Sequence, residues 1–182
     1  MTLQTVAKSQ HEKLDQAEVI ARSLVRMSDT ELLQLIGSTD VRDRIAAVLA
    51  MESRAEEADS IRPYLAAARR LIHDADNTCR WQALILVSFG IEREPELVWD
   101  VIEAEGGSRD EDMRTGVATV LLEDLLDEHF EKYFPLVRER VLSGDEHFAD
   151  TVSGCWLSEP SHKKRIASLV RNAKRGSSTK NT

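Results

Sequence analysis

The sequence predicts an all-α fold in which antiparallel helix pairs stack along the chain as an α-solenoid of about ten helices. Three observations support this prediction. Apolar residues recur at three- and four-residue spacing along most of the chain, which is the period of an amphipathic helix. Only 8 glycines and 4 prolines occur in 182 residues, too few for the many turns of a β-sandwich. A short phrase also recurs near the expected turns between helices.

The recurring phrase is an acidic or small polar residue followed by an arginine and then by an apolar pair. Its arginines are separated by 38 and then by 34 residues, a period typical of stacked two-helix units. The three copies are Ser38-Thr39-Asp40-Val41-Arg42 before Ile45 and Ala46, Asp76-Asn77-Thr78-Cys79-Arg80 before Ala83 and Leu84, and Asp110-Glu111-Asp112-Met113-Arg114 before Val117 and Ala118.

The first elements are set by their capping residues. Residues 1–27 are predicted to be an N-terminal capping helix, with an apolar stripe from about residue 12. Ser28 and Glu31 then form a capping-box pattern before a short helix that Gly37 closes. A helix over about 40–55 follows. Ser60 caps the next one, whose Pro63 lies in the first turn, where a proline costs no hydrogen bond.

The segment over about 77–89 admits two interpretations. Ala83-Leu84-Ile85-Leu86-Val87 is an unbroken apolar run of the kind that a buried strand also contains. We predict a helix, because Asp76 is a good N-cap and the neighbouring segments have a helical period. An inner helix that is covered by adjacent units would be apolar nearly all round, as this run is.

The second half of the chain continues the pattern. Pro95 opens a helix that Gly106-Gly107 ends. Further helices are expected at about 110–126, 130–142 and 146–157, and from about Pro160 to 174. Residues 28–174 thus form the repeat domain. Residues 175–182 contain no apolar side chain to bury, so we predict a disordered tail.

The predicted units resemble HEAT-like repeats, in which an outer helix, a turn and an inner helix form a unit of about 40 residues. The phrase at 74–80 carries the resemblance, together with Pro63 and Pro135 in two outer helices. The match covers about residues 28–157 and departs from the pattern in the last unit, where Ala149 or Asp150 stands in place of the arginine. The resemblance implies a right-handed solenoid and a binding platform, but it does not specify an activity.

A ladder of acid–arginine pairs between neighbouring units is also implied by this resemblance. In the family the acid caps the inner helix and pairs with an arginine. We therefore expect these arginines to be structural and not part of a basic stripe that binds ligand. The ladder residues that the resemblance implies are Asp76, Arg80, Asp110, Arg114 and Arg42.

The net charge of −8 is distributed unevenly. Residues 92–131 contain 14 acidic residues against three arginines, a local net charge of −11, whereas residues 160–182 contain seven basic residues and no acidic one. Such asymmetry can mark a surface that faces a partner. The alternative is that each block is simply a solvated face.

Catalytic and metal-binding chemistry finds little support in the sequence. His129 lies among carboxylates, but no second helix carries a matching carboxylate–histidine pair to complete a metal site. Neither Cys79 nor Cys155 has a histidine neighbour that would lower its pKa, and no phosphate-cradling glycine loop occurs. We therefore predict no catalytic, metal-binding or cofactor-binding residue. The tryptophans Trp81, Trp99 and Trp156 are expected in the core.

The sequence favours a non-catalytic protein-interaction module, of the adaptor, regulatory or inhibitor type, that presents an acidic surface to a basic protein partner. Opposed charge would speed encounter, and aromatic side chains beside the acidic block would supply affinity. A DNA-mimicking acidic surface is a variant of this hypothesis. The candidate partner-binding residues are Glu123, Asp124, Asp127, Glu128, Phe130, Glu131, Tyr133 and Phe134.

Nucleic-acid binding is the alternative, because some alkylation-repair DNA glycosylases use HEAT-like arrays. Those proteins need a basic concave face, since phosphate contacts dominate affinity, and here the inner helices carry few basic residues. The two cysteines in apolar contexts favour free thiols in a reducing cytoplasm. No apolar run approaches the roughly 20 residues needed to span a bilayer, and no signal peptide is recognisable. The sequence leaves the oligomeric state open.

Overall fold

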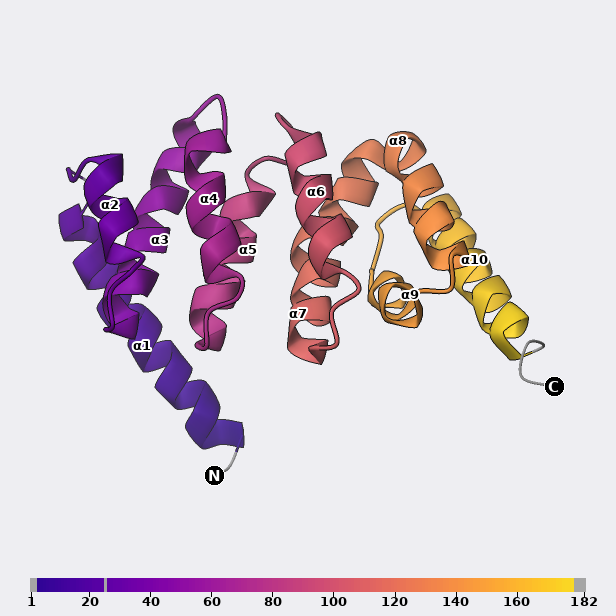
Figure 1. Ribbon diagram of the computed structural model, residues 1–182, viewed down its shortest axis with the longest axis horizontal. Coiled ribbons are helices and arrows are strands. Elements are labelled where there is room, and N and C mark those ends of the chain that lie inside the picture. The colour runs from indigo at the N-terminus through magenta and orange to yellow at the C-terminus, as the bar shows by residue number, and fades with distance from the viewer. Residues whose placement is uncertain (1–2, 25, 179–182) are drawn as a thin grey trace. The chain divides into compact units, whose positions relative to one another are not determined.

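The computed structural model describes residues 3–24 and 26–178, and the side chains of residues 12–24 and 26–173 (Figure 1). The predicted all-α class is confirmed: these residues form helices joined by turns, with no strand among them, and the number of helices is close to ten. The chain divides into two compact units, Met1–Phe89 and Gly90–Thr182, which we call the first and second unit. How the helix pairs stack along the whole chain, as a right-handed solenoid or otherwise, stays a prediction.

The first unit is organised around one central helix. Helices α1 and α5 pack on the flanks of α3, while α2 packs against α3 and α4 against α5. The core between them is apolar and includes Ile45, Met51 and Leu84, each at most 1% exposed. The helices are α1 (Leu3–Leu24), α2 (Asp29–Leu35), α3 (Val41–Glu57), α4 (Arg62–Leu71) and α5 (Asn77–Ser88).

Capping residues set the starts of α2, α3 and α5 as the sequence predicts, whereas the N-cap of α4 is Ile61 and the predicted cap Ser60 accepts from the Arg62 N–H at 3.2 Å. The Ser28 hydroxyl accepts from the Glu31 backbone N–H, and the Glu31 carboxylate accepts from the Ser28 N–H at 2.7 Å, which completes the capping box before α2. Asp40 caps α3 and Asp76 caps α5. Because Asp76 holds the first turn of α5, the apolar run that follows it is helical, and the strand interpretation is excluded.

The second unit is organised around η1, a short helical element in the middle of the segment that follows α6. The six-residue element η1 contacts α6, α7, α8 and α9, and α10 packs against α8 and α9. Its buried residues include Leu121, Leu125 and Phe148, all with no exposed surface. The elements are α6 (Pro95–Glu105), α7 (Glu111–Gly116), η1 (Val117–Leu122), α8 (Glu123–Leu142), α9 (Glu146–Ser153) and α10 (Pro160–Ser178).

The helix expected over 110–126 is longer and less regular than predicted. It runs from Glu111 through η1, which is a π-helical segment, into the first turns of α8. The backbone then breaks at His129, whose φ of −131° and ψ of 36° are not helical. Helix α8 is therefore two helical segments joined at a kink, which matches the predicted boundary before residue 130. The spacing of apolar residues does not reveal a π-helical segment, because a π-helical turn is longer than an α-helical turn by less than one residue.

Several helix ends differ from the predicted boundaries. Helix α1 begins at Leu3 and ends at Leu24, whereas its apolar stripe suggested about 12–27. Helix α9 ends at Ser153, so residues 154–157 form a loop. Helix α10 continues to Ser178, beyond the predicted start of a disordered tail at 175, and residues 179–182 lie outside the described residues. In the part of the chain that the structure describes, no helix combines the length and apolarity needed to cross a membrane.

Candidate functional site

The turn before α3 shows how the recurring phrase folds. Asp40 is the N-cap of α3, and its carboxylate accepts a hydrogen bond from the Arg42 backbone N–H at 2.9 Å. The Asp40 backbone N–H donates to the Ser38 hydroxyl at 3.1 Å, and the Arg44 guanidinium donates to the Ser38 carbonyl oxygen at 2.9 Å. An aspartate cap and an arginine four residues later therefore hold the turn together.

The turn before α5 makes the same contacts. Asp76 is the N-cap, and its backbone N–H donates to the Asp74 carboxylate at 2.9 Å. The Arg80 guanidinium donates to the Asp74 carbonyl oxygen at 3.1 Å and also to the Asn77 side chain. Asp76 has a further contact, an ion pair at 2.9 Å with Lys13 of α1. Its role is thus to cap α5 and to hold α1.

The turn before α7, in the second unit, contains the same two hydrogen bonds for a third time. The Asp110 backbone N–H donates to the Ser108 hydroxyl at 3.2 Å, and the Arg114 guanidinium donates to the Ser108 carbonyl oxygen at 2.9 Å. The equivalent arginines of the three turns are therefore Arg44, Arg80 and Arg114, spaced by 36 and 34 residues. The local conformation recurs, and its period is more regular than the sequence phrase suggested.

The arginine of the first copy is Arg44 rather than the predicted Arg42. The Arg42 guanidinium is exposed and bonds to Asp40 of its own turn, with its Nη2 atom 2.6 Å from Oδ2. Because two residues along a helix are separated by about 200° around its axis, Arg42 and Arg44 point in nearly opposite directions. The sequence offers both arginines, and only the packing decides which one turns toward the neighbouring helix.

Arg44 makes an ion pair in the first unit that corresponds to the predicted ladder contact. Its Nε and Nη2 atoms donate to the two oxygens of Asp74 at 2.8 and 2.9 Å, so the pair is bidentate. The two side chains are 15% and 12% exposed. Burial acts most strongly on Asp74 and raises its pKa, but hydrogen bonds from Arg44 and from the Asp76 N–H outweigh burial and hold the pKa below its usual value. The acid of this contact is Asp74 and not the predicted Asp76.

Arg114 forms the corresponding contact of the second unit, with Asp150 of α9. Its Nε and Nη2 atoms both donate to one carboxylate oxygen, at 3.1 and 3.0 Å. The Arg114 side chain is 12% exposed, whereas that of Asp150 is 58% exposed. Asp110, the predicted ladder acid, caps α7 instead. This contact therefore leaves a largely solvated carboxylate at the surface.

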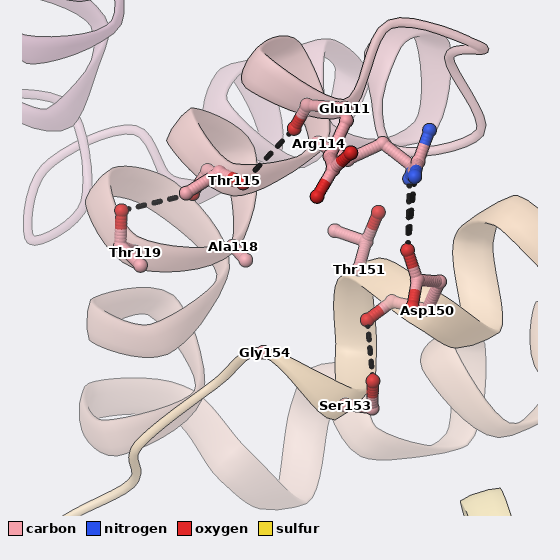
Figure 2. A pocket seen from close by; sticks show the side chains of 9 residues that line it. All are labelled: Glu111, Arg114, Thr115, Ala118, Thr119, Asp150, Thr151, Ser153 and Gly154. Atoms are coloured by element: carbon pink, nitrogen blue, oxygen red, sulfur yellow. Dashed lines mark hydrogen bonds and ion pairs between the residues drawn. The ribbon is translucent and has the colours of Figure 1, made fainter. Parts of the chain in front are cut away.

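A shallow cavity of about 210 Å³ opens beside the Arg114–Asp150 pair, between α7–η1 and α9 (Figure 2). Its lining is partly polar and holds four hydroxyl groups in addition to the ion pair. The hydroxyls of Thr115, Thr119 and Ser153 donate to backbone carbonyls three or four residues earlier, and that of Thr151 donates to the Gly106 carbonyl oxygen at 2.6 Å. The lining residues are Glu111, Arg114, Thr115, Ala118, Thr119, Asp150, Thr151, Ser153 and Gly154.

The loop that leaves this cavity is held against α8 by two of the predicted partner-binding carboxylates. The Glu123 carboxylate accepts from the Trp156 backbone N–H at 2.7 Å. The Asp127 carboxylate accepts from the Ser158 N–H, with its two oxygens at 2.9 and 3.0 Å. Leu157, between them, is 1% exposed. Glu123 and Asp127 thus have a structural task that the sequence did not indicate.

Asp124 and Glu128 lie on the exposed part of the same helical turns. Partial burial of its carboxyl group raises the pKa of Asp124, and the negative charges of Glu123, Asp127 and Glu128 raise it further. This second cause reflects the crowding of four carboxylates on these turns. The surface of α8 here favours a positively charged group.

The aromatic residues predicted as partner anchors are mostly internal. Phe130 is 3% exposed and stacks with two rings, with centroid distances of 4.9 Å to Phe134 and 3.7 Å to His162 of α10. The Arg165 guanidinium lies 4.7 and 4.3 Å from the centroids of Phe130 and Phe134, and it pairs with Glu131 at 2.5 Å. These residues join α10 to α8, so part of the basic segment 160–182 packs against part of the acidic segment 92–131.

Tyr133 and His129 are also engaged inside the second unit. Tyr133 is 2% exposed, and its ring centroid is 5.6 Å from that of Trp99 in α6. The His129 Nε2 atom lies 2.8 Å from the Ile91 carbonyl oxygen, which ties the kink in α8 to the segment before α6. In the described part of the chain, no three histidine, cysteine or acidic side chains are placed to hold a metal ion.

Trp156 lies at the surface, contrary to its expected place in the core. Its side chain is 82% exposed, the largest exposed fraction among the large apolar residues that the structure describes. By contrast, Trp99 is 9% exposed, as predicted. The sequence around Trp156 suggested a continuing helix, and only the early end of α9 at Ser153 places this tryptophan in a loop.

The first unit has a cavity of a different kind, about 290 Å³ in volume, between α1 and α3. Glu52 of α3 lies on its wall, and burial raises the pKa of this carboxyl group to about 8. With its amide oriented to donate, Gln82 of α5 lies 2.9 Å from a Glu52 carboxylate oxygen. The two cysteines are free, with Cys79 buried in this unit and Cys155 half-buried in the other.

Comparison of the chain with protein-family models, with curated proteins and with solved structures gives no match. The candidate site consists of the carboxylates of α8, the loop 154–158 and the adjoining cavity.

Proposed function

We propose that this protein is a non-catalytic protein-interaction module whose second unit presents the acidic turns of α8 to a basic protein partner. The observation that carries the proposal is the crowding of four carboxylates within two turns, at Glu123, Asp124, Asp127 and Glu128, where the pKa of Asp124 is raised partly by its acidic neighbours. A partner's cation would relieve this repulsion, and complementary charge would orient the encounter.

The scaffold that we propose for this module is a right-handed solenoid of helix pairs resembling HEAT-like repeats. Its support is the recurrence of one turn conformation, with an aspartate cap and an arginine four residues later, before α3, α5 and α7. We also propose a cytoplasmic location, which the two free cysteines favour because thiols persist in a reducing compartment.

Binding of a basic probe tests the proposal. We expect an end-blocked hexalysine peptide to bind at low salt and to weaken as salt screens the interaction. The double variant Asp124→Asn, Glu128→Gln should bind it about ten-fold more weakly. A matched double variant, Glu103→Gln, Glu139→Gln, removes the same charge from exposed positions of α6 and α8 and should bind like the parent.

Two results would contradict the proposal, and both can be read by titration calorimetry. If the two double variants weaken peptide binding equally, net charge and not the site on α8 is responsible. If duplex DNA binds at micromolar or better affinity at physiological salt, the protein belongs to the nucleic-acid class.

A further inference from the structure

We propose that Trp156 is the anchor of the interaction site and that it stacks on an arginine side chain of the basic partner. This inference rests on the proposed function and specifies it: it names the contact residue on this chain and the side-chain type on the partner. The loop 154–158, with Trp156 at its outer edge and the carboxylates of α8 beneath it, forms the surface.

The exposure of Trp156 is built into the fold. Its backbone N–H is held by Glu123, the Ser158 N–H is held by Asp127, and the intervening Leu157 side chain is 1% exposed. The chain on either side of the tryptophan is therefore fixed, and the indole is directed away from the packed side of the loop. Because the backbone of the loop is already ordered, binding would restrict only the rotamer of the indole, which favours its use as an anchor.

The charge around the loop selects the partner. Two carboxylates bond the loop backbone, and Asp124 and Glu128 lie exposed on the same turns of α8. An anionic or purely apolar segment would meet uncompensated negative charge at this place. A cationic side chain would pair with a carboxylate while covering the indole, and such cation–π contacts are strongest on tryptophan.

The second unit already contains an internal example of this recognition. Arg165 of α10 stacks over the rings of Phe130 and Phe134 while its guanidinium pairs with Glu131 of α8 at 2.5 Å. An aromatic face next to a carboxylate of α8 thus holds an arginine within the chain. Trp156 beside the preceding acidic turns offers the same combination, with the aromatic face open to solvent.

Arginine suits this site better than lysine because its planar guanidinium can stack on a ring and pair bidentately with a carboxylate at once. The test therefore compares end-blocked hexa-arginine and hexalysine peptides, which carry equal charge. We expect the parent to bind hexa-arginine about five- to thirty-fold more tightly than hexalysine, and Trp156→Ala to remove most of this preference. Trp156→Phe should retain part of it.

The control variant is Leu142→Ala, which truncates another exposed apolar residue of the second unit, 52% exposed at the end of α8. It should leave both affinities unchanged. Because Trp156 is 82% exposed, we expect Trp156→Ala to unfold at the parent's denaturant midpoint, so that a change in binding reports the contact itself.

The outcomes separate this inference from the function on which it rests. If hexa-arginine remains preferred in Trp156→Ala, or if Leu142→Ala has the same effect, the tryptophan is not the anchor, although the acidic surface still binds cations. If neither peptide binds the parent, the proposed function fails and the inference with it. If the protein self-associates and Trp156→Ala abolishes the association, the occupant is a second copy of this chain and not a separate partner.

Discussion

The arginine–aspartate ion pair next to the recurring turn differs between the two units. In the first unit Arg44 and Asp74 are 15% and 12% exposed, and the guanidinium bonds to both carboxylate oxygens. In the second unit Arg114 is equally buried, but it bonds to only one oxygen of Asp150, which is 58% exposed. The first pair is enclosed between helices, whereas the second lies at the mouth of a cavity.

A wider difference accompanies these pairs. In the first unit burial raises the pKa of Glu52, while in the second Asp124, Glu128 and Trp156 face solvent. A charge that is enclosed serves the fold, because it is costly to leave unpaired. A charge that stays solvated contributes little to stability and is free to meet a partner. If the proposed function holds, the enclosed Arg44–Asp74 pair serves stability, and the exposed carboxylates Asp124 and Glu128 serve binding.

The largest expected effect is in the first unit, where Arg44→Ala should lower the free energy of unfolding by about 2–3 kcal/mol. The substitution leaves the half-buried Asp74 carboxylate without its bidentate donor and the Ser38 carbonyl without the Arg44 bond. Urea unfolding followed by circular dichroism measures the change.

Arg42→Ala is the matched control for that substitution, since it removes an exposed arginine two residues away. Its unfolding midpoint should match that of the parent. Equal losses for the two variants would show that Arg42 shares the ladder role, and the register of the first copy would have to be revised.

The second expected effect depends on pH. The pKa of Glu52 is raised from 4.5 to about 8, so the folded state favours the protonated acid. The contribution of the Glu52 carboxyl group to the free energy of unfolding is complete below pH 4.5 and is lost as the pH rises toward 8. Glu52→Gln, which stays neutral, should therefore be more stable than the parent at pH 9 by about 1–2 kcal/mol and equal to it at pH 4. Chemical denaturation at both pH values measures this, and an equal difference at the two would rule out a buried titrating carboxyl.

The smallest of the three effects is expected for Arg114→Ala, at about 1 kcal/mol. Asp150 remains hydrated when its partner is removed, so the main loss is the hydrogen bond to the Ser108 carbonyl. The same denaturation experiment applies. A cost as large as that of Arg44→Ala would erase the contrast between the two units and would make Arg114 an enclosed structural residue.

The candidate site was predictable only in part. The carboxylates of α8 follow from the acidic composition of 92–131, but the sequence does not show that Glu123 and Asp127 bond the loop backbone. Phe130 and Tyr133 looked like surface anchors because they lie beside acidic residues, and they are buried because α10 and α6 cover them. Trp156 looked like a core residue because its apolar neighbours suggested a helix, and the end of α9 exposes it.

The sequence by itself determined the all-helical class and the starts of several helices. Capping residues and apolar periodicity act over three or four residues, so Ser28, Asp40 and Asp76 specify their turns without help from distant segments. Tertiary structure alone decided which of two nearby arginines forms a contact, where α7 passes into the π-helical η1, and which aromatic residue stays exposed. Those choices depend on the surface that the neighbouring helices offer, and residues far apart in the sequence supply that surface.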